Sequence, residues 1–192
     1  MKYFVMLALV MCLTTSVEAE SLPDGWILAG THPKDYKVSL DSGVTYSGSV
    51  SAILESRSER AKGFGTLMQQ CAPGLYLGKR VRITGYIRCK DIKDWASLWF
   101  RVVGENGKTL AFDNMNGRPI KGSTDWKQYQ IVLDVPEGAK VLTFGVQLNG
   151  AGKVWIDDIG FEVVDRSIAT TGKSSRKSYT LPSAPTNLDF EK

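Results

Sequence analysis

The sequence predicts an all-β domain, arranged as a two-sheet antiparallel sandwich of the jelly-roll type. Three observations favour this fold class: short segments with alternating apolar residues, frequent glycine-containing turns between them, and no segment with a convincing apolar stripe of helical period. The clearest segment is 80–89, where Val81, Ile83, Ile87 and Cys89 alternate with polar residues or tyrosine. A period of two is typical of a strand with one buried face.

Other segments repeat this pattern, and about ten strands are expected in all. They cover residues 26–29, 36–40, 44–54, 63–70, 80–89, 96–103, 109–113, 127–135, 141–149 and 154–163. Turns with the residues that favour them separate many of these segments, at 41–43, 105–107, 116–117 and 149–150. Many short strands with such turns favour a sandwich over a helical or mixed fold.

Residues 1–19 are predicted to be a secretory signal peptide. Lys2 gives the positive start, the apolar run extends from Tyr3 to Leu13, and Val17 and Ala19 occupy the −3 and −1 positions of a cleavage site. The apolar run is about half of the ~20 residues that a membrane-spanning helix needs, so no transmembrane segment is expected. The protein is therefore predicted to be exported, either to the periplasm or out of the cell.

The mature chain divides into residues 20–165, predicted to be the β-sandwich, and 166–192, predicted to be a flexible tail. The tail is rich in Ser, Thr, Pro and Lys and has almost no apolar periodicity, so it buries too little surface to fold by itself. Its segment Asn187-Leu188-Asp189-Phe190-Glu191 nevertheless resembles the first strand of known β-sandwich modules. Two interpretations stay open: this segment adds to a sheet of its own or a neighbouring molecule, or it is a disordered end.

The net charge of +4 does not indicate a nucleic-acid-binding protein. The tail holds five basic and two acidic residues, which leaves residues 20–165 close to neutral. A near-neutral domain has no basic stripe for a phosphate backbone. No nucleic-acid partner is expected.

Two cysteines remain in the mature chain, Cys71 and Cys89. In an oxidising compartment such a pair is a disulfide candidate, and the alternative is two buried free thiols. Register argues against the bond. If the flanking strands form a hairpin about residues 74–78, Cys89 lies far beyond the position opposite Cys71, whereas a disulfide needs Cβ atoms about 4 Å apart.

The sequence offers no catalytic constellation, so no enzyme activity is predicted. The single histidine, His32, precedes a proline in a predicted loop, and there is no Gly-x-Ser-x-Gly motif. Cys/His spacings of a metal site are absent, and no cofactor is expected. Asp157 and Asp158 are adjacent on a strand and point to opposite faces. Asp157 either accepts backbone hydrogen bonds at a bulge or contributes to a structural calcium site.

Binding is better supported than catalysis. Trp99 and Arg101 lie on the face of their strand opposite the core face, and Gln147 and Asn149 do so on theirs. An aromatic ring among planar polar groups is what a sugar requires, because its C–H face stacks on the ring and its hydroxyls bond the polar groups. The loop 113–126 is expected to wall one side of this site. The predicted ligand-binding residues are Trp99, Arg101, Gln147, Asn149, Gln69 and Asn114.

A competing interpretation places Trp99 under a loop and pairs Arg101 with Asp113. A sugar-binding function and a protein-binding function are also expected to differ in the side chains that the surface exposes. A sugar-binding module should present an exposed tryptophan over a polar concave face, whereas a protein-binding module should present an apolar patch of several hundred Å².

A series of short motifs resembles a known family. The motifs stand in one order and include Tyr46-Ser47-Gly48, Leu98-Trp99-Phe100-Arg101, Phe112-Asp113-Asn114-Met115, Arg118-Pro119-Ile120, Thr124-Asp125-Trp126 and Trp155-Ile156-Asp157-Asp158. Together they look like the β-sandwich module that accompanies erythromycin-esterase-type domains and some AraC-type transcriptional regulators. That module is similar to the galactose-binding-like jelly roll of carbohydrate-binding modules.

The resemblance spans residues 25–164 and implies a non-catalytic binding module, with carbohydrate or polysaccharide as the expected ligand. Neither an esterase nor a DNA-binding activity is carried over, because the sequence shows no such partner domain. Asn116-Gly117 stands before Arg118 where the family commonly has an acidic residue, which puts an Asp–Arg contact there in doubt. The alternative function is a structural or interaction protein of the cell envelope that binds another protein, or itself through segment 187–191.

Overall fold

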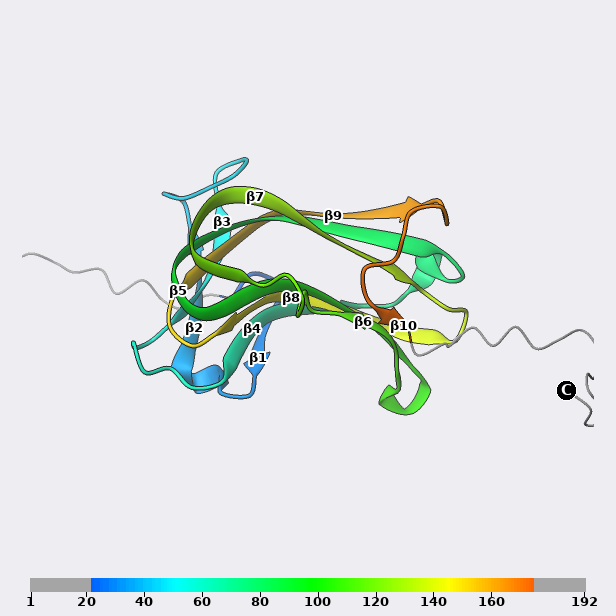
Figure 1. Ribbon diagram of the computed structural model, residues 1–192, viewed down its shortest axis with the longest axis horizontal. Helices are drawn as coiled ribbons and strands as arrows, with labels where there is room; N and C mark the ends of the chain where they lie inside the picture. The colour runs from blue at the N-terminus through cyan, green and yellow to red at the C-terminus, as the bar shows by residue number, and fades with distance from the viewer. Residues whose placement is uncertain (1–21, 175–192) are drawn as a thin grey trace, which may run out of the picture.

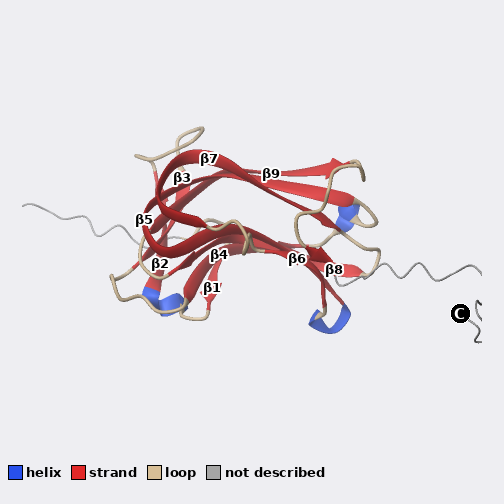
Figure 2. Ribbon diagram, viewed as in Figure 1, coloured by secondary structure: helices blue, strands red, loops and turns tan. Residues whose placement is uncertain are grey.

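The computed structural model describes residues 22–174 and contains two stacked layers of antiparallel strands, seen edge-on in Figure 1. Within the described residues the only helical elements are three single 3₁₀ turns, coloured blue in Figure 2. No helix among residues 22–174 is long and apolar enough to cross a bilayer. The strands are β1 (Ile27–Gly30), β2 (Tyr36–Asp41), β3 (Ser51–Ser56), β4 (Phe64–Cys71), β5 (Arg80–Gly104), β6 (Thr109–Asp113), β7 (Ile120–Asp134), β8 (Ala139–Asn149), β9 (Lys153–Val164) and β10 (Lys173–Ser174).

Strand β5 connects the two layers. Its first half pairs with β7 and β9, and β9 continues through β3 to β2. Its second half pairs with β8 and β6, and β8 continues through β4 to β1. Figure 1 shows β5 turning at one end of the molecule from the upper layer into the lower one. The hydrogen-bonded sheet therefore folds back on itself as a near-barrel, which confirms the predicted all-β sandwich.

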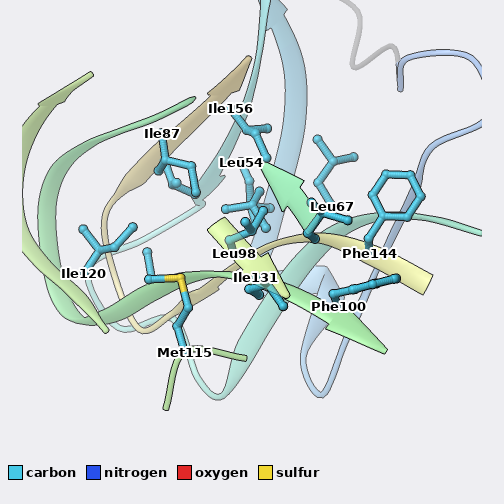
Figure 3. Packing of buried hydrophobic residues seen from close by; sticks show 14 of the residues in the cluster. Leu54, Leu67, Ile87, Leu98, Phe100, Met115, Ile120, Ile131, Phe144 and Ile156 are labelled. Atoms are coloured by element: carbon cyan, nitrogen blue, oxygen red, sulfur yellow. The ribbon is translucent and has the colours of Figure 1, made fainter. Parts of the chain in front are cut away.

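The core lies between the layers and is built by the alternation that the sequence displays. Leu98 and Phe100 face it from the lower layer, and Ile83 and Ile87 face it from the upper layer; all four are fully buried. Figure 3 shows the side chains of this cluster converging from both layers. Because each strand alternates inward and outward residues, every core residue fixes the direction of its neighbours, and the outer faces carry the remaining side chains.

The observed strands differ from the prediction in three places. Segments 80–89 and 96–103 belong to one continuous strand, because residues 90–95 stay paired through register shifts against β7. Residues 44–50 are not a strand, and β3 begins only at Ser51. Residues 120–126, which were expected to be loop, are the first half of β7. Charged and glycine residues weaken the alternation in 90–95 and 120–126, so pairing with a neighbouring strand decides their conformation.

The first nine residues of the predicted tail pack on the sandwich. The Arg80 guanidinium donates Nη1 hydrogen bonds to the carbonyls of Arg166 and Ile168 at 2.7 and 2.6 Å. Further on, the backbone N–H of Thr171 donates to the Val132 carbonyl, and β10 pairs with β6. The predicted boundary at residue 165 therefore falls too early. Segment 187–191 lies outside the described residues.

Cys71 and Cys89 are free thiols, so the structure contradicts the disulfide alternative. Cys71 lies opposite Leu142 at the end of β4 in the lower layer, whereas Cys89 lies opposite Val154 and Thr124 in the upper layer. The two positions belong to different layers. The register argument reached the same outcome from another premise, a hairpin of the two flanking strands, which the structure does not contain because β4 pairs with β8 and the first half of β5 pairs with β7 and β9. Burial raises the pKa of the Cys89 thiol to about 12, as expected for an unreactive core cysteine.

We expect Leu98→Ala to destabilise the protein by about 3 kcal/mol, because it removes apolar contacts and leaves a cavity where Leu98 is fully buried. Urea unfolding followed by circular dichroism measures the loss. The matched control is Leu75→Ala, since Leu75 is 85% exposed and its removal leaves no cavity. Equal effects of the two variants would contradict the placement of the core.

A second prediction concerns the ion pair between Arg80 and Asp134. Arg80 donates Nε to Oδ1 at 2.8 Å and Nη2 to Oδ2 at 3.0 Å, and these bonds lower the pKa of the Asp134 carboxyl. A lowered carboxyl pKa stabilises the fold above the unfolded value of about 3.9, and this contribution disappears as the pH falls through the folded value. Asp134→Asn should therefore reduce the free energy of unfolding at neutral pH and differ less from the parent in acid.

Urea unfolding at several pH values measures that difference. Asp125→Asn is the control, because the Asp125 side chain is 88% exposed and its contact with Arg88 at 3.7 Å is a surface pair of little energetic value. A gap between parent and Asp134→Asn that stays constant down to acid pH would show that the ion pair does not titrate as described.

Candidate functional site

The outer face of the lower layer carries rows of side chains that point away from the core, several of which are themselves buried. In one row Thr66, Gln147 and Ser97 lie side by side on β4, β8 and β5, because each is paired directly with the next. In the next row Met68, Gly145 and Trp99 lie side by side by the same pairing. Paired residues of an antiparallel sheet point to the same face, so the register brings these side chains together.

A hollow of about 330 Å³ lies on this face. Such a volume is at the lower end of the range for small-molecule sites. The 3₁₀ turns next to β2 and after β5 project beyond the lower layer at its two ends (Figure 1). The lining residues come from β1, the following turn, β4, β5, β6 and β8: Ala29, Gly30, Thr31, Phe64, Thr66, Met68, Trp99, Arg101, Phe112 and Gln147.

The Trp99 ring is part of the surface that lines the hollow and does not project from it. Its indole Nε1 donates to the Thr66 Oγ1 at 2.9 Å. Since Trp99 is on β5 and Thr66 is two strands away on β4, the ring extends across β8, where Gly145 has no side chain to obstruct it. Trp99 is only 5% exposed, so the expectation of an exposed platform is wrong. The hydrogen bond to Thr66 is the reason, because it holds the ring against the sheet.

Three polar atoms in this region are buried without a hydrogen-bond partner among the described residues. They are Ser97 Oγ, Gln147 Oε1 and Arg101 Nε. Ser97 and Gln147 are direct cross-strand neighbours, and Arg101 is two residues from Trp99 on the same face of β5. An unsatisfied buried polar atom costs about 1–3 kcal/mol. Gln147 and Arg101 line the hollow, and Ser97 lies directly beside Gln147, so this grouping indicates a site whose polar groups serve something other than folding.

The structure brings together three of the six predicted ligand residues, Trp99, Arg101 and Gln147. Asn149 lies at the end of β8 and donates its amide to Asp94 at 3.1 Å, away from the lining. Asn114 borders a separate, small hollow of about 50 Å³. Neither residue contributes to the main hollow in this conformation.

The assignment of Gln69 is wrong by one position in the strand. Gln69 is paired with Phe144, which belongs to the core cluster, so its side chain points to the inner face. Its neighbour Gln70 points to the outer face and donates Nε2 to Thr143 Oγ1 at 3.4 Å. A shift of one residue exchanges the two faces of a strand, and the sequence pattern around residue 69 is too irregular to fix it.

Sequence reasoning missed the aromatic residues Phe64 and Phe112, which line the hollow on either side of Trp99. Phe112 is paired with Arg101 on the adjacent strand, and Phe64 stands at the start of β4, two residues before Thr66. The alternation of β4 and β6 could have placed both on the outer face. Only the pairing of β6 with β5 reveals that Phe112 lies beside Arg101.

Arg101 does not pair with Asp113, so that part of the competing interpretation is wrong. Asp113 faces inward and binds Arg118 Nη2 at 2.8 Å, and its Oδ1 also accepts from the Met115 backbone N–H at 2.7 Å. Arg118 thus pairs with Asp113, although the acidic residue that the family commonly has just before this arginine is replaced here by Asn116-Gly117. This pair folds the turn that follows β6 and leaves Arg101 to the hollow.

A second hollow, of about 460 Å³, lies where β5, β7 and β9 meet and includes Arg88, Lys90, Asp91 and Asp125. Its charges largely satisfy one another. Arg88 lies 3.7 Å from Asp125, and Asp91 accepts from and donates to Ser123. We favour the lower hollow as the functional site, because two of its described lining side chains, Gln147 and Arg101, have buried polar atoms without partners, whereas only Thr124 does in the second hollow.

Near the second hollow, three aromatic rings cover the outer face of the upper layer. Tyr46 stacks on Tyr86 with ring centroids 3.5 Å apart, and Trp126 contacts Tyr46 edge-on at 6.0 Å. The Asp157 carboxylate anchors this arrangement by accepting the backbone N–H groups of Tyr46 and Ser47. Asp157 therefore accepts backbone hydrogen bonds beside a bulge in the β5–β9 pairing, as one interpretation predicted.

Residues 22–174 contain no group of three or more His, Cys, Asp or Glu side chains that could hold a metal ion. The exposed His32 ring contacts only the Thr31 hydroxyl among the hydrogen bonds described, at 3.3 Å. The geometry of the described residues thus gives no support to the calcium interpretation of Asp157.

No family model matches the sequence. A protein of Bacillus subtilis (strain 168), named as the uncharacterized HTH-type transcriptional regulator YbfP, is 44% identical to this chain over 168 residues. The match covers 87% of this chain and 56% of the relative, so the chain spans only about half the length of that regulator.

Solved structures with the same fold are far more distant in sequence. The CBM22-1 xylan-binding domain of Paenibacillus barcinonensis Xyn10C has a TM-score of 0.55 at 17% identity, over 73% of this chain and 86% of that one. The enzymatically active domain of bacteriophage CBA120 tailspike protein 4 has a TM-score of 0.59 at 15% identity, over 76% of this chain and 20% of that one. The Stig cyclase Fisc of Fischerella sp. TAU has a TM-score of 0.54 at 14% identity, over 77% and 89%.

These neighbours establish that the chain has a β-sandwich fold like that of the xylan-binding domain. Because two of them are enzymes by name, the fold alone does not decide between binding and catalysis. None of the reported names mentions an AraC-type regulator or an erythromycin esterase. The chain is similar to part of a helix-turn-helix regulator. The resemblance to the modules of AraC-type regulators and erythromycin esterases stays a prediction.

The packing of Gly145 yields a testable prediction. A Cβ at this position would lie 2.0 Å from the Leu67 carbonyl oxygen, closer than any real contact, so β8 would have to move away from β4. We expect Gly145→Ala to destabilise the protein by about 2–4 kcal/mol, as steric conflicts in a core do. Thermal and urea unfolding measure the effect.

Gly138→Ala is the control, because nothing lies within 4 Å of a Cβ there. A Gly145→Ala protein as stable as this control would contradict the described strand spacing.

Proposed function

We propose that the described domain is a non-catalytic carbohydrate-binding module, and that the hollow around Gln147, Arg101 and Trp99 is its site. The observation that carries the proposal is the cluster of buried polar atoms without partners at a hollow flanked by aromatic rings. The likeness of the fold to xylan-binding domains supports the proposal. The export expected from residues 1–19 would place such a module where polysaccharides are exposed.

The polar groups of the hollow suit sugar hydroxyls. Gln147 carries both a donor and an acceptor on a planar amide, and Arg101 carries several donors in a planar fork. The last torsion of a glutamine side chain is soft, so a modest rotation presents either the oxygen or the nitrogen to a ligand. Vicinal hydroxyls of a sugar ring can donate to one group and accept from the other, which would satisfy atoms that the fold leaves unpaired.

The apolar groups suit the other surface of a sugar ring. Phe64 and Phe112 are half-buried at the sides of the hollow, and Met68 and Trp99 form its floor. A pyranose presents axial C–H groups on one face, and their contact with an aromatic ring removes apolar surface from water. Because Trp99 is buried, we assign the stacking contact to the phenylalanine rings and assign Trp99 the role of a rigid support.

The relative from Bacillus subtilis fits the same proposal. In the helix-turn-helix regulator, the similar region would serve as the ligand-binding part. Its ligand would be a small molecule and not the surface of a polysaccharide. The chemistry of the binding site would then be what the two proteins share. The runner-up function, recognition of another protein, has no comparable observation, because the exposed large apolar side chains of the described residues are spread over several elements.

The proposal is tested with Gln147→Ala in calorimetric titrations against a panel of neutral and acidic oligosaccharides. We expect the parent to bind at least one class and the variant to lose about 10- to 100-fold in affinity, as the loss of a hydrogen bond in a desolvated site does. Intrinsic tryptophan fluorescence provides a second readout, because Trp99 touches the same hollow.

Gln128→Ala is the matched control, since Gln128 is an exposed glutamine of β7, opposite Tyr86 in the other layer. It should bind like the parent. Absence of binding across the whole panel by a folded protein would overturn the proposal, and so would binding that Gln147→Ala leaves unchanged.

A further inference from the structure

Arg101 is the only ionisable residue among those that line the hollow. It is held on β5 between Thr143 of β8 and Phe112 of β6, so its backbone is fixed on both sides by strand pairing. A side chain supported in this way starts from a defined position, which favours directional contacts with a ligand.

The charge of Arg101 is not compensated within the described residues. No carboxylate forms an ion pair with it, and its Nε has no hydrogen-bond partner. Three arginines elsewhere on the sandwich differ from it, because each pairs with a carboxylate: Arg80 with Asp134, Arg82 with Glu162, and Arg118 with Asp113. The one arginine in the hollow is thus left with a free positive charge.

The surroundings of Arg101 strengthen any charge–charge contact made there. Arg101 is half-buried, and Trp99, Met68 and Phe112 line the same hollow. These largely apolar side chains do not solvate an anion as water does. The attraction between opposite charges rises as the local dielectric falls. An anionic group that entered the hollow would therefore gain more from Arg101 than from an arginine on an open surface.

We infer that the hollow selects an acidic sugar, a uronic acid whose carboxylate pairs with Arg101. This inference rests on the proposed function, carbohydrate binding, and specifies in addition that the ligand carries a negative charge. The carboxylate accepts two parallel N–H bonds from the guanidinium, a geometry that a planar carboxylate matches and a hydroxyl does not. The ring hydroxyls bond Gln147, and the C–H face lies against the aromatic wall.

The inference is tested by calorimetric titration with an oligogalacturonate and an oligoglucuronate, each beside its methyl ester. Esterification removes the charge and keeps the ring and its hydroxyls. We expect at least one acid to bind tenfold or more tightly than its ester, and added salt to weaken the acid alone. In Arg101→Gln the acid and the ester should bind equally, and Arg101→Lys should recover only part of the preference, because a lysine cannot form the two parallel bonds.

Arg88→Gln is the matched control, since Arg88 lies on the outer face of the other layer and should leave the preference for the acid unchanged. Esters that bind as tightly as the acids, or an unchanged ratio in Arg101→Gln, would overturn the preference for acid and leave the carbohydrate-binding proposal intact. A sulfated oligosaccharide that binds more tightly than both uronates would also overturn it. Failure of every acid, ester and neutral sugar to bind would overturn both proposals.

Discussion

The pairing of β5 with four other strands is the constraint on which the rest of the structure depends. Its first half is hydrogen-bonded to β7 and β9 and its second half to β8 and β6. One continuous backbone thus belongs to both layers, and the register of each layer is tied to that of the other. A slip of one residue in the first half would turn Ile83 outward, and a slip in the second half would turn Leu98 outward. The large apolar area buried between the layers opposes such a slip.

The same register builds the hollow on the outer face. Once Leu98 and Phe100 point into the core, Trp99 and Arg101 must point out, and the pairing with β8 places Gly145 and Gln147 beside them. Gly145 serves two purposes at this point: it allows the close approach of the Leu67 carbonyl and leaves room for the indole to reach Thr66. The polar atoms that remain without partners reduce stability by a few kcal/mol in the free protein, on the order of 1–3 for each. The well-packed core is what makes this cost tolerable.

The sequence predicted the fold class because strands with one buried face alternate strongly, and 109–113 was placed within its observed bounds. It also placed Trp99, Arg101 and Gln147 on one outer face, since the flanking core residues leave no choice of parity. It failed where the alternation is weak. Gln69 was put on the wrong face, and 120–126 was taken as loop although it is paired with β5. Phe112 was missed as a wall of the hollow, because its nearness to Arg101 arises from pairing between strands and not from local pattern.

The fold and the site answer different questions about this protein. The sandwich occurs in xylan-binding domains, in a tailspike enzyme domain and in a cyclase, so its architecture is compatible with binding and with catalysis. The side chains that line the hollow discriminate between these. Catalysis of hydrolysis requires groups that exchange protons at a reacting bond, commonly two carboxylates on either side of it. The hollow instead offers an amide, a guanidinium, a threonine hydroxyl and aromatic rings, none of which readily changes its protonation near neutral pH. Groups of this kind can hold a polar ligand through hydrogen bonds and contact area, which is the chemical basis of the binding role proposed for the hollow.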